Sequence, residues 1–66
     1  GRSVMDHVTQ AIEALPPSQK AVLVLRGQQD LDPAEVCEIL GITDGNLRVL
    51  LHRARLAIRA TLDALH

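Results

Sequence analysis

Residues 32–55, DPAEVCEILGITDGNLRVLLHRAR, contain two helical patterns separated by a short break. The first pattern starts at Asp32-Pro33, and proline suits the first turn of a helix because its missing N–H is not needed there. Gly41 then ends the pattern, since glycine readily adopts the left-handed backbone conformation that a tight turn requires. The second pattern starts at Thr43, a residue type that commonly caps a helix N-terminus. Two helices joined by such a turn are typical of a helix-turn-helix.

The side chains around the turn also fit a steep crossing of two helices. Cys37 is small and lies four positions before Gly41, where the helices must approach closely. The residues expected to fill the crossing are apolar: Val36, Leu40, Ile42, Leu47 and either Leu50 or Leu51. Glu35 stands three residues after Asp32, a spacing that predicts a capping box. Residues 43–46 are short or polar, so the helix that they begin is the one expected to enter a DNA groove.

Helical patterns occupy the rest of the chain as well. We predict one helix from about Ser3 to Leu15, ended by Pro16-Pro17, and a second from about Pro17 to Arg26, closed by a left-handed Gly27. The helix after Thr43 should be long, because one apolar stripe continues through Leu47, Leu51, Ala54, Ile58, Leu62 and Leu65. The sequence therefore predicts an all-α, four-helix module that contains a helix-turn-helix and a long C-terminal recognition helix.

Length and composition limit the possible functions. Sixty-six residues suffice for a single domain over 1–66, and the absence of aromatic residues disfavours a binder of single strands, which relies on base stacking. A lone cysteine, Cys37, excludes an internal disulfide and a zinc cluster. We see no nucleophile–base set, phosphate loop or membrane span, and so expect a cytoplasmic protein that is neither an enzyme nor cofactor-dependent.

The charges are segregated along the chain although the net charge is only −1. Residues 1–44 contain three basic and seven acidic residues, whereas residues 45–66 contain four arginines and one acid. Attraction to phosphate depends on the local field more than on the total charge. The sequence therefore favours a weak, salt-sensitive contact between the C-terminal helix and DNA.

Three segments, in this order, resemble the C-terminal promoter-binding domain (region 4) of bacterial sigma factors. They are LPPSQKAVLVLR at 15–26, DPAEVCEILGI at 32–42 and GNLRVLLHRAR at 45–55, and the last is most similar to the extracytoplasmic-function group. The resemblance covers about residues 11–60. It implies a domain that reads the promoter −35 element in double-stranded DNA and docks on the β-subunit flap of RNA polymerase. It also implies an anti-sigma protein as a partner.

The same resemblance implies that this chain is a fragment of a longer sigma factor. In the family a second domain reads the −10 element and melts DNA, and a chain of 66 residues has no room for it. We expect the isolated module to be a monomer.

The resemblance also implies roles for individual residues. Arg48 and His52 lie one turn apart and would face base edges, flanked by Asn46 and Val49. The residues expected to contact phosphates through their side chains are Arg53 and Arg55 in the last helix, and Lys20 and Arg26 in the second. The start of the reading helix, at Thr43 and Gly45, would offer backbone N–H groups to a phosphate.

The chain departs from the family pattern at 46–50, where NLRVL replaces the frequent Thr-Val-Lys-Ser-Arg. Val49 and Leu50 thus replace a serine and a basic residue, which removes a phosphate contact and makes this surface more apolar. Two alternatives remain at this point. A response-regulator output domain would share the fold and bind a palindrome as a dimer. A protein-interaction module would use the acidic first half and the apolar Val49-Leu50 surface, for example to bind an anti-sigma protein.

Overall fold

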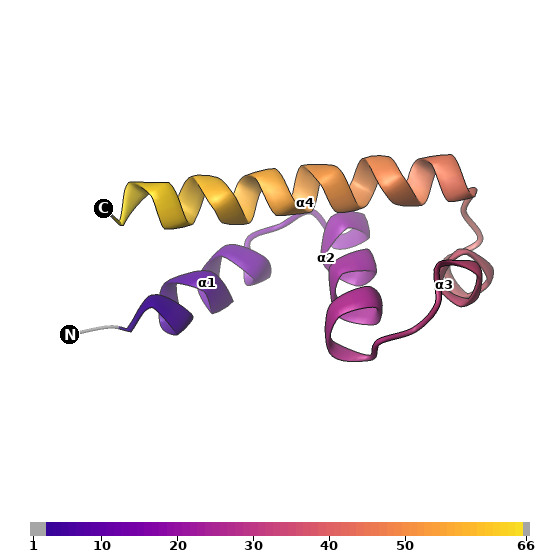
Figure 1. Ribbon diagram of the computed structural model, residues 1–66, viewed down its shortest axis with the longest axis horizontal. Coiled ribbons are helices and arrows are strands. Elements are labelled where there is room, and N and C mark those ends of the chain that lie inside the picture. The colour runs from indigo at the N-terminus through magenta and orange to yellow at the C-terminus, as the bar shows by residue number, and fades with distance from the viewer. Residues whose placement is uncertain (1–2, 66) are drawn as a thin grey trace.

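The computed structural model describes residues 3–65, which form four α-helices and a short π-helix. In chain order these are α1 (Val4–Glu13), α2 (Pro17–Leu23), the π-helix η1 (Val24–Gln28), α3 (Pro33–Leu40) and α4 (Asp44–Ala64). Figure 1 shows α4 running along the whole molecule, with α1, α2 and α3 following one another beside it. The predicted all-α architecture with a long last helix is confirmed.

The core lies where α2, α3 and α4 meet. Val22 of α2 and Val36 of α3 are fully buried and pack in one cluster with Leu47 and Leu51 of α4. Around this cluster lie half-buried side chains that include Leu40, Ile42 and Leu50, together with Cys37. The apolar residues predicted to fill the crossing therefore do so, and Leu51 rather than Leu50 is the buried member of the last pair.

The apolar stripe of α4 is buried only along its first half. Ala54 is fully buried and Ile58 half-buried, but Leu62 and Leu65 are exposed. The reason is that α1 packs along this end of α4 with an apolar face that is itself partly exposed, including Val4 at 55%. Although α4 is 21 residues long, no helix in residues 3–65 is long and apolar enough to cross a membrane.

The turn of the helix-turn-helix has the predicted local chemistry at two positions. Gly41 has φ 66° and ψ 37°, the left-handed conformation expected of it, and its N–H donates to the Cys37 carbonyl. Thr43 caps α4, because its Oγ1 accepts the Asn46 N–H at 3.1 Å. These two residues fix the point at which the chain leaves α3 and enters α4.

The predicted capping box at the start of α3 is wrong. Asp32 occupies the cap position of α3, but its side chain makes no capping hydrogen bond, so there is no capping box with Glu35. The capping box is at α1 instead, where Ser3 and Asp6 each accept the other's N–H at 3.3 Å.

Gly27 does not close a helix in the left-handed conformation. It lies inside η1, where the chain widens into a π-turn and the Gln29 N–H donates to the Val24 carbonyl at 3.1 Å. The helical segment therefore continues past Gly27, and the reversal falls on Asp30, whose φ is 54°. The wider π-turn was not visible in the sequence, where a glycine after Arg26 resembles an ordinary helix end.

Candidate nucleic-acid interface

The first two turns of α4 present an exposed polar face next to the turn of the helix-turn-helix. Leu47 and Leu51 are buried and hold one side of the helix on the core. Arg48 and Val49, which lie between them, face solvent, since successive helical positions point about 100° apart. The predicted site residues in this segment are all exposed: Thr43, Gly45, Asn46, Arg48, Val49 and His52.

Arg48 is the most prominent cation of this face. Its side chain is 80% exposed, and its Nη2 lies 3.0 Å from Oδ2 of Asp44, one turn earlier. An exposed pair at this spacing is worth only about 0.3–0.5 kcal/mol, so the guanidinium can leave Asp44 for another acceptor at little cost. This ion pair was not predicted from the sequence, although the i,i+4 spacing of acid and arginine signals it.

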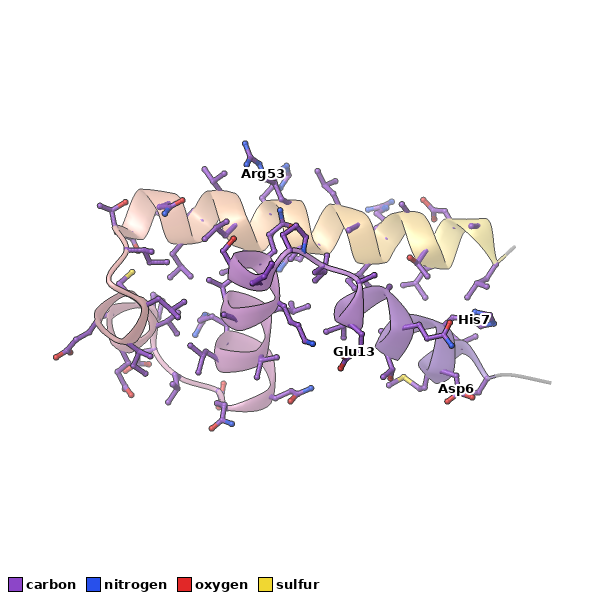
Figure 2. The ribbon with its side chains drawn as sticks, turned by 180° about the vertical axis from the view of Figure 1, so that it is seen from behind. Asp6, His7, Glu13 and Arg53 are labelled. Atoms are coloured by element: carbon purple, nitrogen blue, oxygen red, sulfur yellow. The ribbon has the colours of Figure 1, made fainter. Side chains whose placement is uncertain are left out.

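The polar side chains divide into two flanks of α4. Arg48 and His52 lie four residues apart on one flank, and Arg55 and Arg59 continue that flank toward the C-terminus. Asn46, Val49 and Arg53 repeat at three- and four-residue intervals on the other flank. Figure 2 shows Arg53 pointing away from the three other helices. The base-facing pair and its predicted neighbours thus belong to adjacent sides of one helix.

Two residues outside α4 were predicted to contact phosphate, Lys20 and Arg26, and both have partners within the molecule. Nζ of Lys20 lies 2.6 Å from Oε2 of Glu13, which ties α2 to the end of α1. Arg26 is half-buried in η1, and its Nη1 donates to the carbonyl of Leu31. Neither is a free surface cation, and their contacts with phosphate stay predictions.

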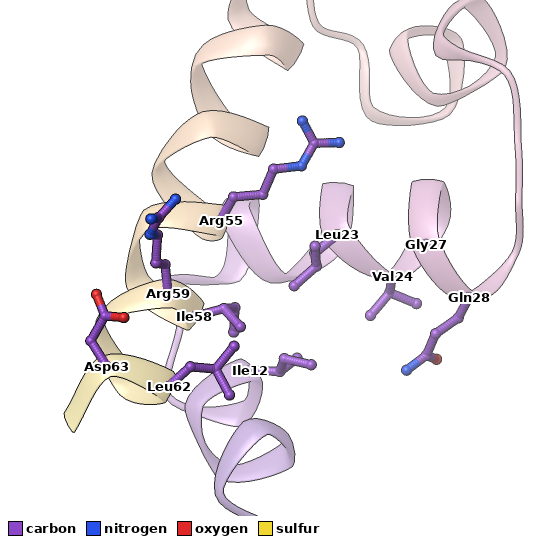
Figure 3. A pocket seen from close by; sticks show the side chains of 10 residues that line it. All are labelled: Ile12, Leu23, Val24, Gly27, Gln28, Arg55, Ile58, Arg59, Leu62 and Asp63. Atoms are coloured by element: carbon purple, nitrogen blue, oxygen red, sulfur yellow. The ribbon is translucent and has the colours of Figure 1, made fainter. Parts of the chain in front are cut away.

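An open apolar groove of about 640 Å³ lies between the C-terminal half of α4 and the facing surfaces of α1, α2 and η1. Its apolar lining consists of Ile12, Leu23, Val24, Ile58 and Leu62. Arg55 and Arg59 stand at one side of it, as Figure 3 shows. Arg55, predicted to hold a phosphate, therefore belongs to the edge of this groove. The groove could not be predicted from the sequence, because three separate segments of the chain form it.

The sequence was compared with models of known protein families. The family model for Sigma-70, region 4 matches residues 6–58, which include most of α1, the whole helix-turn-helix and the first 15 of the 21 residues of α4. The chain belongs to the sigma-70 region 4 family. Region 4 binds the promoter −35 element and RNA polymerase in transcription initiation and is not an enzyme. The match overturns the response-regulator alternative. A search of curated proteins gave no match.

Within this region 4 domain, the family match covers the polar surface and part of the groove. It includes the exposed start of α4 with Arg48 and His52, and it extends to Ile58 in the groove. A domain that binds both DNA and polymerase needs two surfaces that can be occupied at once. The two ends of α4 supply one polar and one apolar surface.

Proposed function

We propose that this region 4 domain reads the −35 element with the flank of α4 that carries Arg48 and His52. The observation that carries the proposal is the exposure of this pair at the start of a helix whose opposite side is buried in the core. Arginine can donate two hydrogen bonds to O6 and N7 of guanine in the major groove. Asn46 and Val49, on the adjacent flank, would contact neighbouring bases, and Val49 suits a thymine methyl group.

Phosphate contacts would hold α4 in this orientation. Thr43 Oγ1 accepts the Asn46 N–H, and the N–H groups of Asp44 and Gly45 at the positive end of the helix would then be the donors to a phosphate. Arg53, Lys20 and Arg55 would add side-chain contacts. Lys20 would first have to leave Glu13, and the exposure of Glu13 keeps that cost small.

Substitution of Arg48 tests the reading face. Arg48→Ala should weaken binding to a −35 duplex by about 1–3 kcal/mol at fixed salt and relax the preference at one base pair. Arg59→Ala is the matched control, because Arg59 is also an exposed arginine of α4 but lies three turns farther along the helix. Binding should be compared by titration against duplexes substituted at each position. Equal affinity of Arg48→Ala and the parent chain would remove Arg48 from the reading face.

We further propose that the apolar groove receives protein partners, namely the β-subunit flap of RNA polymerase and an anti-sigma protein. Its open shape and apolar lining support a protein helix as occupant, and Arg59 would favour an acidic residue on that helix. The similarity of GNLRVLLHRAR at 45–55 to the extracytoplasmic-function group supports assignment to that group. The chain would act as one domain of a longer sigma factor.

A charge placed in the groove tests this second surface. Ile58→Asp should weaken binding to an isolated flap domain at least tenfold, because it places a charged group in the apolar lining against which the partner would pack. Leu56→Asp is the matched control, since Leu56 is 53% exposed and lies on the opposite side of α4. Far-UV circular dichroism should confirm that both variants stay helical. Flap affinity that is equal in the two variants would exclude the groove as the docking site.

A further inference from the structure

Leu31 is tied to η1 through both of its backbone polar groups. Its N–H donates to the carbonyl of Leu25 at 3.1 Å, and its carbonyl accepts a hydrogen bond from Nη1 of Arg26. The Leu31 side chain is half-buried against the core. Because Asp32 follows directly as the N-cap of α3, these two bonds fix where the helix-turn-helix begins.

The Arg26 side chain is held inside the molecule. The residue is half-buried, and its Nε is inaccessible to solvent with no hydrogen-bond partner among residues 3–65. Burying an N–H donor without a partner is unfavourable, so another interaction must retain the side chain in this position. The bond from its charged guanidinium to the Leu31 carbonyl is of the stronger, charge-assisted kind and supplies that interaction.

The link between η1 and α3 needs such a restraint. Asp30 has φ 54°, a left-handed conformation that is unfavourable for residues other than glycine, although aspartate tolerates it better than most. A strained residue of this kind persists when the surrounding structure holds it. The hydrogen bonds at Leu31 close the segment from Leu25 to Leu31 around it.

We propose that Arg26 is a positioning residue for promoter binding and does not act as a phosphate clamp. It fixes the link at Leu31, the link fixes the start of α3, and α3 determines through the Gly41 turn where the reading helix begins. Arg26 thus acts on DNA through the orientation of the helix-turn-helix. The inference rests on DNA binding by region 4 and is independent of the contact assigned to Arg48.

Substitution by methionine separates the two roles, because methionine keeps an unbranched apolar stem but has no donor and no charge. In Arg26→Met, amide hydrogen exchange at Leu31 should accelerate about tenfold or more, as expected for loss of a charged hydrogen bond. Affinity for a −35 duplex should fall at every salt concentration, with an unchanged slope of log K against log salt. Arg26→Lys, which keeps the charge, should show faster exchange at Leu31 as well.

A phosphate contact would give the opposite pattern. Arg26→Met would then make the salt slope shallower by about 0.9, Arg26→Lys would bind normally, and exchange at Leu31 would not change in either variant. Lys20→Gln serves as the reference for a phosphate contact, because Lys20 is one of the residues proposed to contact phosphate: it should make the salt slope shallower and leave exchange at Leu31 unchanged. The exchange measurement uses the chain without DNA, so unchanged exchange at Leu31 in both Arg26 variants overturns the proposal even where DNA affinity is low.

Discussion

At the scale of single residues, Asp44 has two opposing effects on the reading end of α4. Its carboxylate lies in the first turn, where a negative charge stabilises a helix, and it pairs with Arg48 at 3.0 Å. The same charge stands where DNA phosphates would approach, so it should repel them. Asp44 therefore favours the free domain over the complex.

Neutralising Asp44 should strengthen DNA binding. We expect Asp44→Asn to raise affinity for the −35 duplex several-fold at low salt, because it frees Arg48 and removes a repulsive charge, and the gain should shrink as salt screens both effects. Asp63→Asn, at the far end of α4, is the control and should change little. Weaker binding by Asp44→Asn would mean that the ion pair holds Arg48 in its productive position.

Gly41 and Gly27 provide a second test at this scale, since a Cβ would meet no atom within 4 Å at either position. Only Gly41 has a positive φ, so Gly41→Ala should destabilise the domain by about 1 kcal/mol. Gly27→Ala should be neutral or stabilising by up to about 1 kcal/mol, because alanine lowers the entropy of the unfolded chain. Urea unfolding followed at 222 nm gives both values. Equal effects of the two substitutions would contradict a strained turn at Gly41.

At the scale of elements, Val36 is the fully buried side chain through which α3 packs on the core. Val36→Ala should lower the free energy of unfolding by about 2 kcal/mol, because it removes buried methyl groups and leaves a cavity. Ile39 is on the same helix but is 60% exposed, so Ile39→Ala should lower the free energy of unfolding by less than about 0.5 kcal/mol. Thermal unfolding of the two variants makes the comparison. A similar loss in both would show that α3 is held by features other than this contact.

The elements that sequence predicts well are those fixed by local chemistry. The left-handed Gly41 and the Thr43 cap depend on their own backbone and on a residue three positions away, so both could be read from the chain. The burial of Leu47 and Leu51 follows from helical spacing in the same way. The exposure of Arg48 and His52 could be predicted as well, because they lie off that apolar stripe.

The features that sequence reasoning missed depend on contacts between distant segments. The π-turn around Gly27 is stabilised by Leu25 and Arg26 bonding to Leu31, which no single helical pattern reveals. The groove requires Ile12 and Ile58 to face each other from opposite ends of the chain. Exposure of Leu62 likewise depends on how much of α4 the short α1 can cover. Each outcome was set by packing that periodicity does not encode.

At the scale of the whole molecule, the segregated charges limit how DNA binding responds to salt. The chain places four arginines and one acid in residues 45–66, whereas the first 44 residues carry an excess of acids. Each phosphate neutralised contributes about −0.9 to the slope of log K against log salt. We expect a slope no steeper than about −4, measured by titrating the −35 duplex between 50 and 200 mM salt, conditions that resolve such slopes. A steeper slope would require cations other than Arg48, Arg53, Arg55 and Lys20 to reach the DNA.

One rigid helix carries both proposed surfaces, and this fixes the orientation of one surface relative to the other about the helix axis. Arg48 and Arg55 are seven residues apart on α4, which corresponds to about 10 Å along the axis and an angular offset of only about 20°. A base edge at Arg48 and a protein partner beside Arg55 in the groove would thus approach α4 at nearly the same angle about its axis, about 10 Å apart along it. One residue inserted between them would rotate that direction by about 100°, whereas seven would nearly restore it. The number of residues between Arg48 and Arg55 would then determine the angle between the bound promoter and the bound polymerase.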